Sequence, residues 1–367
     1  MTDLDDARLA RAFQCAEQSI GLSDPNPRVG CVIGSQDGTI LAEGWTQAAG
    51  QAHAEVAALA DARRRGIDVK AATAWVTLEP CSHHGRTPPC CDALIEAGIA
   101  RVVVAALDPN PEVHGRGIAR LRRAGLQVDL AGDAQAERCR ELNIGFFSRM
   151  TRGRPWVRMK VACSLDGRVS LPDGRSRWIT GAEARTDGHR WRKRAGAVVT
   201  GIGTVLADDP RLDVRLVETS LQPLRVILDS SARLPPSAAI LQPPGQVLWV
   251  HGDDVARHSD GLCPSIERCA LPRRDSRIDP QAVIALLAGR AINEVHVEAG
   301  PILNAALLDA DLVDELLVYQ APMLIGPGRP IADVPLLASL ESAPRFTFKE
   351  VALVGSDLRL LLRRPQG

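Results

Sequence analysis

The sequence predicts two layered α/β domains in a chain of 367 residues. At roughly 150 residues per domain, this length fits about two domains. Helix-period and strand-period segments alternate along both halves, which is typical of layered α/β folds. A polar stretch with Gly and Pro, Arg149-Met-Thr-Arg-Gly-Arg-Pro155, separates the two series. We therefore expect one domain over residues 1–149 and a second over residues 150–367.

The first half begins with a helix and continues with alternating strands and helices. Leu9, Phe13, Ala16 and Ile20 recur at helical spacing and predict one buried stripe, which Asp24-Pro-Asn-Pro27 ends. Residues 35–38 have the composition of a hairpin turn. The further elements expected here are strands over 29–33, 39–45, 73–78, 101–107 and 126–130, and helices over 55–65, 90–97 and 118–124.

The second half restarts with a strand and alternates again. Many prolines and polar residues between 234 and 277 predict long loops around one of the strands. A helix is expected over 302–308. The strands expected in this half cover 156–162, 197–200, 224–228, 246–250, 294–298 and 315–322.

Composition and charge argue for a globular protein without affinity for nucleic acid or membranes. Apolar residues make up 45% and charged residues 24%, an ordinary globular balance. Forty-four basic and forty-four acidic side chains cancel, and aromatic residues reach only 3%, so electrostatic attraction and stacking platforms for nucleic acid are weak. The acidic start has no signal-peptide core, and no run of 18 apolar residues occurs, so a cytoplasmic protein is expected.

The chain contains nine cysteines, an odd number scattered over a long sequence. This pattern disfavours a disulfide framework and favours a subset used for metal binding or catalysis. The cysteines are Cys15, Cys31, Cys81, Cys90, Cys91, Cys139, Cys163, Cys263 and Cys269.

The strongest chemical pattern is His53-Ala-Glu55 followed by Pro80-Cys81 and Cys90. A zinc ion that activates water takes three protein ligands and keeps one open position, and His53, Cys81 and Cys90 supply an imidazole and two thiolates. Glu55 is then the candidate proton carrier rather than a ligand. A His-x-Glu with a later Pro-Cys and a second Cys is the signature of zinc deaminases. We therefore predict a zinc-dependent deaminase site in the first domain.

Several alternatives remain open at this site. A lone His-x-Glu at a helix start is more often an ordinary surface pair, and the nine-residue step from Cys81 to Cys90 is longer than the two-residue spacer of the usual signature. Cys91 could replace Cys90 as a ligand. His83 and His84 could also bind metal, although a pocket-lining or solvent-facing role is the stronger expectation for them.

The second half carries weaker signals for phosphate binding. Gly201-Ile-Gly-Thr204 and Gly300-Pro301 each follow an expected strand, where backbone amides could approach a phosphate. The third glycine of the dinucleotide fingerprint is missing, and tight packing is the more common reason for such a turn. A basic run is usually a solvated helix face, yet a phosphorylated substrate would employ part of it. The run consists of Arg185, His189, Arg190, Arg192, Lys193 and Arg194.

These residues resemble a known family, the bifunctional deaminase/reductases of riboflavin biosynthesis. Nearly the whole chain takes part in the resemblance, and the motifs follow the family's order. In the first half the matching motifs are Asn26-Pro-Arg-Val-Gly30, Pro80-Cys-Ser-His-His-Gly-Arg-Thr-Pro-Pro-Cys90 and Asp108-Pro-Asn-Pro111 with Gly115 and Gly117. In the second half they are Lys160-Val-Ala-Cys-Ser-Leu-Asp-Gly167, Ser176-Arg-Trp-Ile-Thr180, Thr204-Val-Leu-Ala-Asp-Asp-Pro210, Val297-Glu-Ala-Gly-Pro301 and Val313-Asp-Glu-Leu316.

The resemblance implies a cytidine-deaminase-like three-layer α/β/α domain followed by a dihydrofolate-reductase-like α/β domain that uses NADPH. By motif position, the NADPH contacts would be Ala162, Trp178, Thr204, Asp208, Ser230 and Gly300, Pro301, Ile302, Leu303, Asn304, Ala305 and Ala306. The contacts to the phosphorylated pyrimidine would be Asn26, Ser176, Arg192, Leu212, Arg215 and Glu298. Arg192 and Arg215 suit a phosphate because a guanidinium can bind two oxygens at once.

The expected activity is bifunctional: zinc-dependent deamination of a phosphoribosylaminopyrimidine, then NADPH-dependent reduction of its ribosyl chain to ribityl. The resemblance also suggests a homodimer or larger assembly. His84 stands where Tyr is common and Asp213 where Thr is expected, which concerns the two substrate pockets. The proton donor of the reduction stays open between Asp208, Lys160, Glu298 and solvent.

Two rival functions share part of this pattern. The first is a deaminase for another base, such as a deoxycytidylate or a tRNA adenosine, with a degenerate second domain. The neutral charge and the complete second-half motifs oppose it. The second is a binding module that keeps zinc only for structure, which the presence of Glu55 opposes, because a structural site needs no proton carrier.

Overall fold

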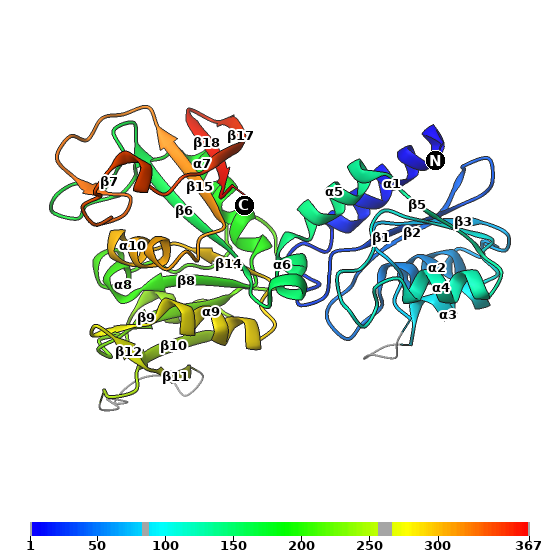
Figure 1. Cartoon of the computed structure of the whole chain (residues 1–367), viewed down its shortest axis with the longest axis horizontal. Coiled ribbons are helices and arrows are strands. Elements are labelled where there is room, and N and C mark those ends of the chain that lie inside the picture. The colour runs from blue at the N-terminus through cyan, green and yellow to red at the C-terminus, as the bar shows by residue number, and fades with distance from the viewer. Residues whose placement is uncertain (1, 83–87, 256–265, 366–367) are drawn as a thin grey trace. The chain divides into compact units, whose positions relative to one another are not determined.

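The computed structural model of the chain describes residues 2–82, 88–255 and 266–365. The chain divides into two compact units, Met1–Gly153 and Arg154–Gly367, and each is considered by itself (Figure 1). Both units are mixed α/β structures, as the sequence predicts.

The first unit is built on a five-stranded sheet in the order β2-β1-β3-β4-β5. Strand β1 runs antiparallel to β2 and β3, whereas β3, β4 and β5 are parallel. Helices α2, α3 and α4 lie on one face of the sheet and α1 and α5 on the other, which gives three layers (Figure 1). The elements are α1 (Asp3–Glu17), β1 (Gly30–Gly34), β2 (Ile40–Trp45), α2 (Ala54–Arg64), β3 (Thr73–Val76), α3 (Cys90–Glu96), β4 (Arg101–Val104), α4 (Arg116–Arg123), β5 (Gln127–Leu130), α5 (Asp133–Leu142) and α6 (Ile144–Arg152).

The expected elements of this unit are present, with two differences. Leu9, Phe13 and Ala16 are buried on α1, but Ile20 lies beyond the end of that helix in a run of turns and is only half-buried. Helices α5 and α6 were not predicted. The signal of α5 is weak because this helix buries only Cys139, so no apolar stripe marks it in the sequence.

Asp5 at the start of α1 ties three segments of this unit together. Its carboxylate accepts hydrogen bonds from Trp75 Nε1 at 2.9 Å and from Arg101 Nη1 at 2.8 Å, and it forms a capping box with Thr2. Burial alone would raise the pKa of Asp5, but the hydrogen bonds from Arg101, the Thr2 amide and Trp75 hold that pKa well below its usual value.

Replacing Asp5 by Asn is expected to lower the free energy of unfolding at pH 7 by about 2 kcal/mol, the range for hydrogen bonds to charged groups. Because the pKa of Asp5 is lower in the folded than in the unfolded state, its contribution is complete above pH of about 4, the unfolded pKa, and fades as the pH falls below it. Urea denaturation of the wild type and of Asp5→Asn, at pH 7 and near pH 3, measures the difference in their free energies of unfolding. A difference that stayed constant, or grew in acid, would contradict the assignment.

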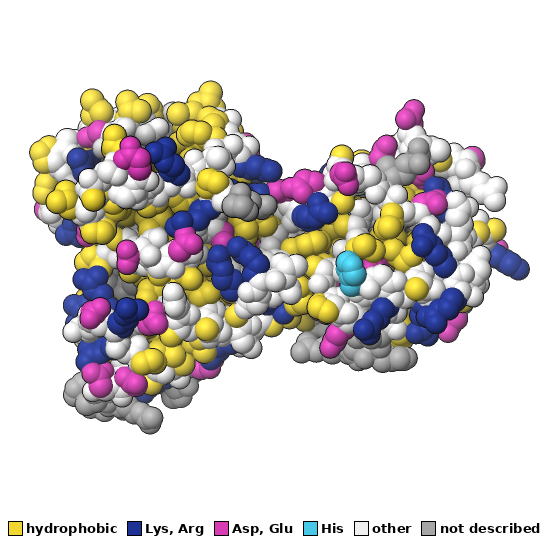
Figure 2. Space-filling view, viewed as in Figure 1, with side chains coloured by type: hydrophobic (Ala, Val, Ile, Leu, Met, Phe, Trp, Pro, Cys, Tyr) yellow, Lys and Arg dark blue, Asp and Glu magenta, His cyan; other side chains and the backbone are white. Residues whose placement is uncertain are grey.

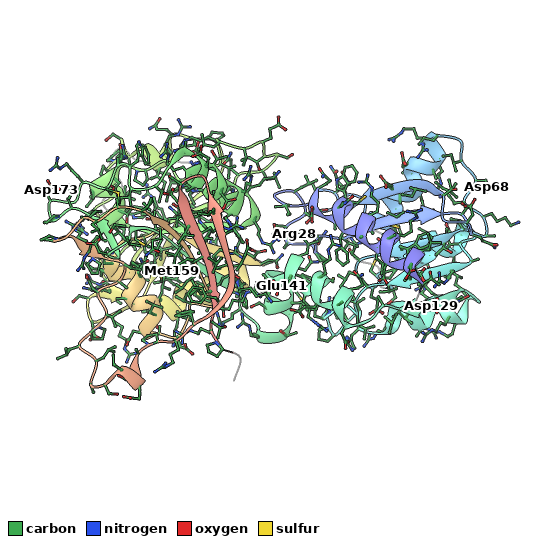
Figure 3. The ribbon with its side chains drawn as sticks, turned by 90° about the horizontal axis from the view of Figure 1, so that it is seen from above. Arg28, Asp68, Asp129, Glu141, Met159 and Asp173 are labelled. Atoms are coloured by element: carbon green, nitrogen blue, oxygen red, sulfur yellow. The ribbon has the colours of Figure 1, made fainter. Side chains whose placement is uncertain are left out.

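The second unit contains a nine-stranded sheet in the order β11-β10-β9-β8-β14-β6-β15-β18-β17. Seven neighbouring strands from β11 to β15 are parallel, and the β18–β17 hairpin adds two antiparallel strands at the edge. Met159 on the interior strand β6 is fully buried and is labelled in the second unit in Figure 3. The helices are α7 (Ala182–Arg194), α8 (Ile202–Asp208), α9 (Pro280–Gly289) and α10 (Pro301–Asp309).

The strands expected in this half are present, and others were not predicted. The main strands are β6 (Trp156–Ser164), β8 (Ala197–Gly201), β9 (Leu224–Asp229), β10 (Val247–Gly252), β14 (Glu294–Val297) and β15 (Glu315–Ala321). The expectation of long loops up to residue 277 is partly wrong, since that stretch also contains β11 (Glu267–Leu271), β12 (Arg273–Arg274) and β13 (Arg277–Ile278). Short strands β7 (Arg168–Ser170) and β16 (Arg329–Pro330) pair with each other, and β17 (Thr347–Val354) and β18 (Asp357–Arg363) close the chain.

Candidate active sites

The first unit brings His53, Cys81 and Cys90 together from three segments. His53 is the N-cap residue of α2, Cys81 follows β3, and Cys90 begins α3. His53 Nδ1 lies 3.6 Å from Cys81 Sγ and 3.3 Å from Cys90 Sγ. One ligand atom from each of the three residues falls within 4.8 Å of the other two.

The donor set fits a zinc ion. Zinc–nitrogen bonds of about 2.0 Å and zinc–sulfur bonds of about 2.3 Å at tetrahedral angles place nitrogen and sulfur about 3.5 Å apart. The two distances from His53 Nδ1 to the sulfurs bracket this value. Three protein ligands leave the fourth position for water or substrate, as in catalytic rather than structural zinc sites.

The surroundings of the two cysteines favour a metal-binding thiolate. The side chain of Cys90, His53 and the Cys90 amide, which donates to Cys81 Sγ at 3.3 Å, lower the pKa of the Cys81 thiol to about 4, although burial opposes this. The pKa of Cys90 rises instead, because it shares a proton with Cys81 and is buried. A cation between the two sulfurs would remove this conflict.

Glu55 lies in the first turn of α2, beside the three ligands, and is only 3% exposed. Burial, reinforced by the negative charge of Cys81, raises the pKa of its carboxyl group to about 7. A carboxyl group that can hold or release a proton near neutral pH, placed next to a metal site, is suited to general acid and base catalysis.

The alternative ligands do not join this cluster. Cys91 is buried and points elsewhere, since its Sγ donates to the carbonyl oxygens of Pro80 at 3.4 Å and Gly117 at 3.5 Å. His83 and His84 lie outside the described residues. The eight described cysteines are free, in agreement with the expectation of no disulfide framework.

Glu79 is a positioning residue that the sequence did not single out. Its carboxylate accepts hydrogen bonds from the amides of Gly115 and Gly117, both at 2.9 Å, and from those of Asp108 and Ile118 at 3.3 and 3.2 Å. Because Glu79 is two residues before Cys81, these bonds fix the start of α4 against the ligand segment. The signal available in the sequence was its position, directly after the strand expected over 73–78 and before Pro80-Cys81.

The second unit contains a cavity of about 1990 Å³ at the carboxyl ends of its parallel strands, where open α/β sheets bind ligands. Its volume exceeds that of a single-ligand pocket of about 300–1,000 Å³, so it has room for a cofactor and a substrate. All the residues assigned to the reductase half line it: Ala162, Ser176, Trp178, Arg192, Thr204, Asp208, Leu212, Arg215, Ser230, Glu298 and Gly300 to Ala306. Asn26 belongs to the first unit, half-buried in the loop before β1.

A charged cluster occupies the floor of this cavity. Arg192 on α7 binds the carboxylate of Glu298 with two nitrogens, one of them at 3.0 Å from Oε2, and Lys160 Nζ lies 3.6 Å away. Although burial opposes it, the charges of Arg192 and Lys160 hold the pKa of Glu298 well below its usual value. Arg192 also donates to the Asp213 carbonyl oxygen at 2.9 Å, which joins α7 to the segment after α8.

The basic run on α7 is therefore only in part a solvated face: Arg190 is exposed, whereas other members are bound within the unit. Arg192 is committed to Glu298, and Arg194 donates to Glu294 at 2.9 Å. His189 is buried, and its burial next to Arg192 and Arg215 lowers its pKa to about 4, so it is neutral at pH 7. Its Nδ1 accepts a hydrogen bond from the Arg215 amide at 3.2 Å.

Asp213, the residue that departs from the expected Thr, lies behind the cavity wall. Its carboxylate pairs with Arg215 Nη1 at 2.7 Å and with Arg211 Nη2 at 2.9 Å. Both arginines line the cavity, whereas Asp213 is only 4% exposed. Asp213 thus holds two guanidinium groups side by side at the cavity wall.

Trp178 offers an aromatic surface to the same cavity. Its ring is 64% exposed, and the guanidinium groups of Arg177 and Arg185 lie 5.7 Å and 4.7 Å from the ring centroid. An exposed aromatic ring lining a cavity is suited to stack on a flat heterocycle.

The two units match two different family models. Residues 3–106 match the model "Cytidine and deoxycytidylate deaminase zinc-binding region", and residues 155–360 match the model "RibD C-terminal domain". Fold and sites together define a two-part enzyme with a zinc-binding deaminase unit and a reductase unit.

Full-length relatives narrow this class to a family. The riboflavin biosynthesis protein RibD of Escherichia coli K12 is 43% identical over 98% of this chain and 99% of its own, and that of Haemophilus influenzae is 41% identical over 96% and 95%. The solved structure of RibD from Acinetobacter baumannii covers 99% of both chains with a TM-score of 0.87 at 38% identity. A diaminohydroxyphosphoribosylaminopyrimidine deaminase/5-amino-6-(5-phosphoribosylamino)uracil reductase from Thermotoga maritima also reaches 0.87 over 99% of both chains, at 32% identity. The chain belongs to the RibD family of riboflavin biosynthesis proteins.

Proposed function

We propose that the chain catalyses two successive steps of riboflavin biosynthesis. The first unit deaminates 2,5-diamino-6-(5-phosphoribosylamino)pyrimidin-4(3H)-one by hydrolysis and releases ammonia. The second unit reduces the ribosyl chain of the product, 5-amino-6-(5-phosphoribosylamino)uracil, to ribityl. The observation that carries the proposal is the presence of the His53, Cys81 and Cys90 cluster and the large charged cavity in one chain that matches RibD proteins over nearly its full length.

In the deaminase unit, His53, Cys81 and Cys90 would hold the zinc ion and Glu55 would move the proton. A zinc ion bound there lowers the pKa of a coordinated water toward about 7 and so supplies a nucleophile at neutral pH. The Glu55 carboxylate would hold a proton and deliver it to the departing amino group, which leaves as ammonia. Its burial keeps the proton on this path, and Glu79 holds the ligand segment in place.

In the reductase unit, the cavity would position a nicotinamide against the sugar. NADPH, when bound, supplies the hydride that reduces C1′ of the ring-opened ribosyl group. The residues from Gly300 to Ala306, at the start of α10, would bind the cofactor, and Trp178 would stack on one of its flat rings. Arg192 and Glu298 fix one another, so their orientation is set before substrate arrives, which lowers the ordering cost of binding.

Arg215 would bind the substrate phosphate, with Asp213 as its positioning partner. Replacing Arg215 by Ala is expected to raise the KM for 5-amino-6-(5-phosphoribosylamino)uracil by about tenfold or more, since a charge-assisted hydrogen bond contributes about 1.5–3 kcal/mol. The kcat should change little, because the phosphate is remote from the reacting carbon. Steady-state kinetics measure the split. An unchanged KM would remove the phosphate role.

The rival function, a deaminase for another base with a degenerate second unit, fits the structure less well. The second unit matches the RibD C-terminal model over residues 155–360 and keeps a charged cavity. The test is NADPH oxidation with 5-amino-6-(5-phosphoribosylamino)uracil, followed by the absorbance of the reduced nicotinamide. Consumption supports the reductase assignment; its lack in folded, zinc-loaded protein would leave a single-activity deaminase.

We also propose a homo-oligomer, dimer or larger, in the cytoplasm. Hydrophobic side chains gather on the end of the second unit where β17 lies (Figure 2). On this edge strand Phe348, Val351 and Leu353 are exposed. An exposed apolar edge strand can pair with another chain. Light scattering measures the mass, and a monomer would contradict the assembly.

The proposal of a cytoplasmic location rests on the cysteines, because free cysteines are typical of a reducing compartment. Among the described helices, none is long and apolar enough to span a bilayer.

A further inference from the structure

Three arginines that line the cavity of the second unit at the end of β9, Arg233, Arg274 and Arg277, have no acidic partner among the described residues. Four of the basic side chains that line this cavity pair with acids: Arg192 and Lys160 with Glu298, and Arg211 and Arg215 with Asp213. By contrast, within the part of the chain that the structure describes, no hydrogen bond or ion pair involves the guanidinium groups of Arg233, Arg274 and Arg277, all of which line the cavity and are exposed.

These arginines come from two segments that meet at the end of β9. Arg233 lies in the turn that follows β9, three residues after Ser230. Arg274 and Arg277 belong to the β12–β13 hairpin, which is bound to that turn because the Ile278 amide donates to Ser230 Oγ at 3.0 Å. A carboxyl end of a parallel strand is where open α/β sheets bind dinucleotides, and Ser230 is itself an expected NADPH contact.

The hairpin directs two positive charges to the same side. Arg274 and Arg277 are paired directly across β12 and β13, and residues so paired project from the same face. Asp275 and Ser276 between them have positive φ values of 50° and 65°, as in the tight two-residue hairpin turn. Like charges directly opposite one another destabilise a strand pair. An anion bound between them would reverse that cost.

We propose that Arg233, Arg274 and Arg277 bind the 2′-phosphate of the adenosine ribose and thereby select NADPH over NADH. This rests on the proposed function, because it assumes that the cavity binds a nicotinamide dinucleotide. NADPH differs from NADH only by that phosphate, a dianion for which guanidinium forks are the best protein partner. The substrate phosphate has separate candidates in Arg192 and Arg215, so the three unpaired arginines remain available for the cofactor.

The test compares binding of two nucleotides by titration calorimetry. Adenosine 2′,5′-bisphosphate carries the 2′-phosphate, and adenosine 5′-diphosphate lacks it. Each of the variants Arg233→Ala, Arg274→Ala and Arg277→Ala should weaken binding of the bisphosphate and of NADPH by about tenfold, and leave the diphosphate and NADH unchanged. Arg274→Lys, which keeps the charge without the fork, should recover part of the loss.

Arg345→Ala is the matched control, because Arg345 is an exposed arginine of the same unit outside the cavity lining. It should leave the binding of all four nucleotides unchanged. Equal losses for NADPH and NADH in the three variants, or no loss for NADPH, would overturn the inference while the reductase function stands. A raised KM for the pyrimidine phosphate with unchanged NADPH binding would also overturn it. If the wild-type protein bound neither NADPH nor NADH, the proposed reductase function would fall, and the inference with it.

Discussion

Replacing Glu55 by Gln is expected to lower the rate of ammonia release by about 10²- to 10⁴-fold, the usual contribution of a positioned general acid and base. Gln has nearly the same shape but cannot exchange a proton at neutral pH. The side chain is not among the three clustered ligands, so zinc content should stay at one ion per chain. The measurement pairs ammonia release with metal analysis of the same sample.

The second unit supplies the internal control for this variant. Reduction of 5-amino-6-(5-phosphoribosylamino)uracil by NADPH should proceed at the wild-type rate, because Glu55 belongs to the first unit. Full ammonia release by a zinc-loaded Glu55→Gln protein would disprove the proton-carrier role. Loss of zinc together with activity would instead make Glu55 a determinant of metal binding.

Replacing Cys81 by Ser is expected to remove both the zinc ion and the deaminase activity. Loss of an outer partner of a metal ligand costs about 10- to 100-fold in affinity, and loss of a ligand itself should cost more. Cys81 is also the cysteine whose pKa is lowered to about 4, so it is the thiolate that the site prepares for the metal.

Cys91 provides the matched control, since it is a neighbouring buried cysteine whose sulfur faces Pro80 and Gly117. Cys91→Ala should keep zinc and most of the deaminase activity. Both variants should retain NADPH-dependent reduction, which shows that the chain is folded. Full zinc occupancy in Cys81→Ser, or zinc loss in Cys91→Ala alone, would contradict the ligand assignment.

The zinc site could be predicted from the sequence because its residues fall in short, chemically specific motifs. His53 and Glu55 are two residues apart, and Pro80 directly precedes Cys81, as the deaminase signature requires. Cys90 was the predicted ligand, with Cys91 as an alternative, and only the fold shows that Cys90 faces His53 whereas Cys91 faces Pro80.

The reductase cavity was assigned by resemblance, and its physical logic appears only in three dimensions. Arg192 and Glu298 are 106 positions apart, and no periodicity in the sequence pairs them. For the same reason the sequence does not show which members of the basic run on α7 are paired: the acidic partners Glu294 and Glu298 come from β14 and the residue that follows it.

The edge hairpin was missed for a different reason. Phe348, Val351 and Leu353 on β17 are exposed, so that strand lacks the alternation of buried and solvated positions by which half-buried strands are recognised. The Asp213 departure, by contrast, was visible in the sequence, but its effect on Arg211 and Arg215 required their distances.

The most direct test of the whole account supplies 2,5-diamino-6-(5-phosphoribosylamino)pyrimidin-4(3H)-one and NADPH to the full chain and measures ammonia and oxidised cofactor together. The account predicts that the two rise in step, one NADPH oxidised per ammonia released, and that Glu55→Gln loses both from this substrate yet still reduces the deaminated one. NADPH oxidation at the wild-type rate without ammonia release would contradict the proposed order of reactions. Ammonia release without any NADPH oxidation would contradict the assignment of a reductase to the second unit.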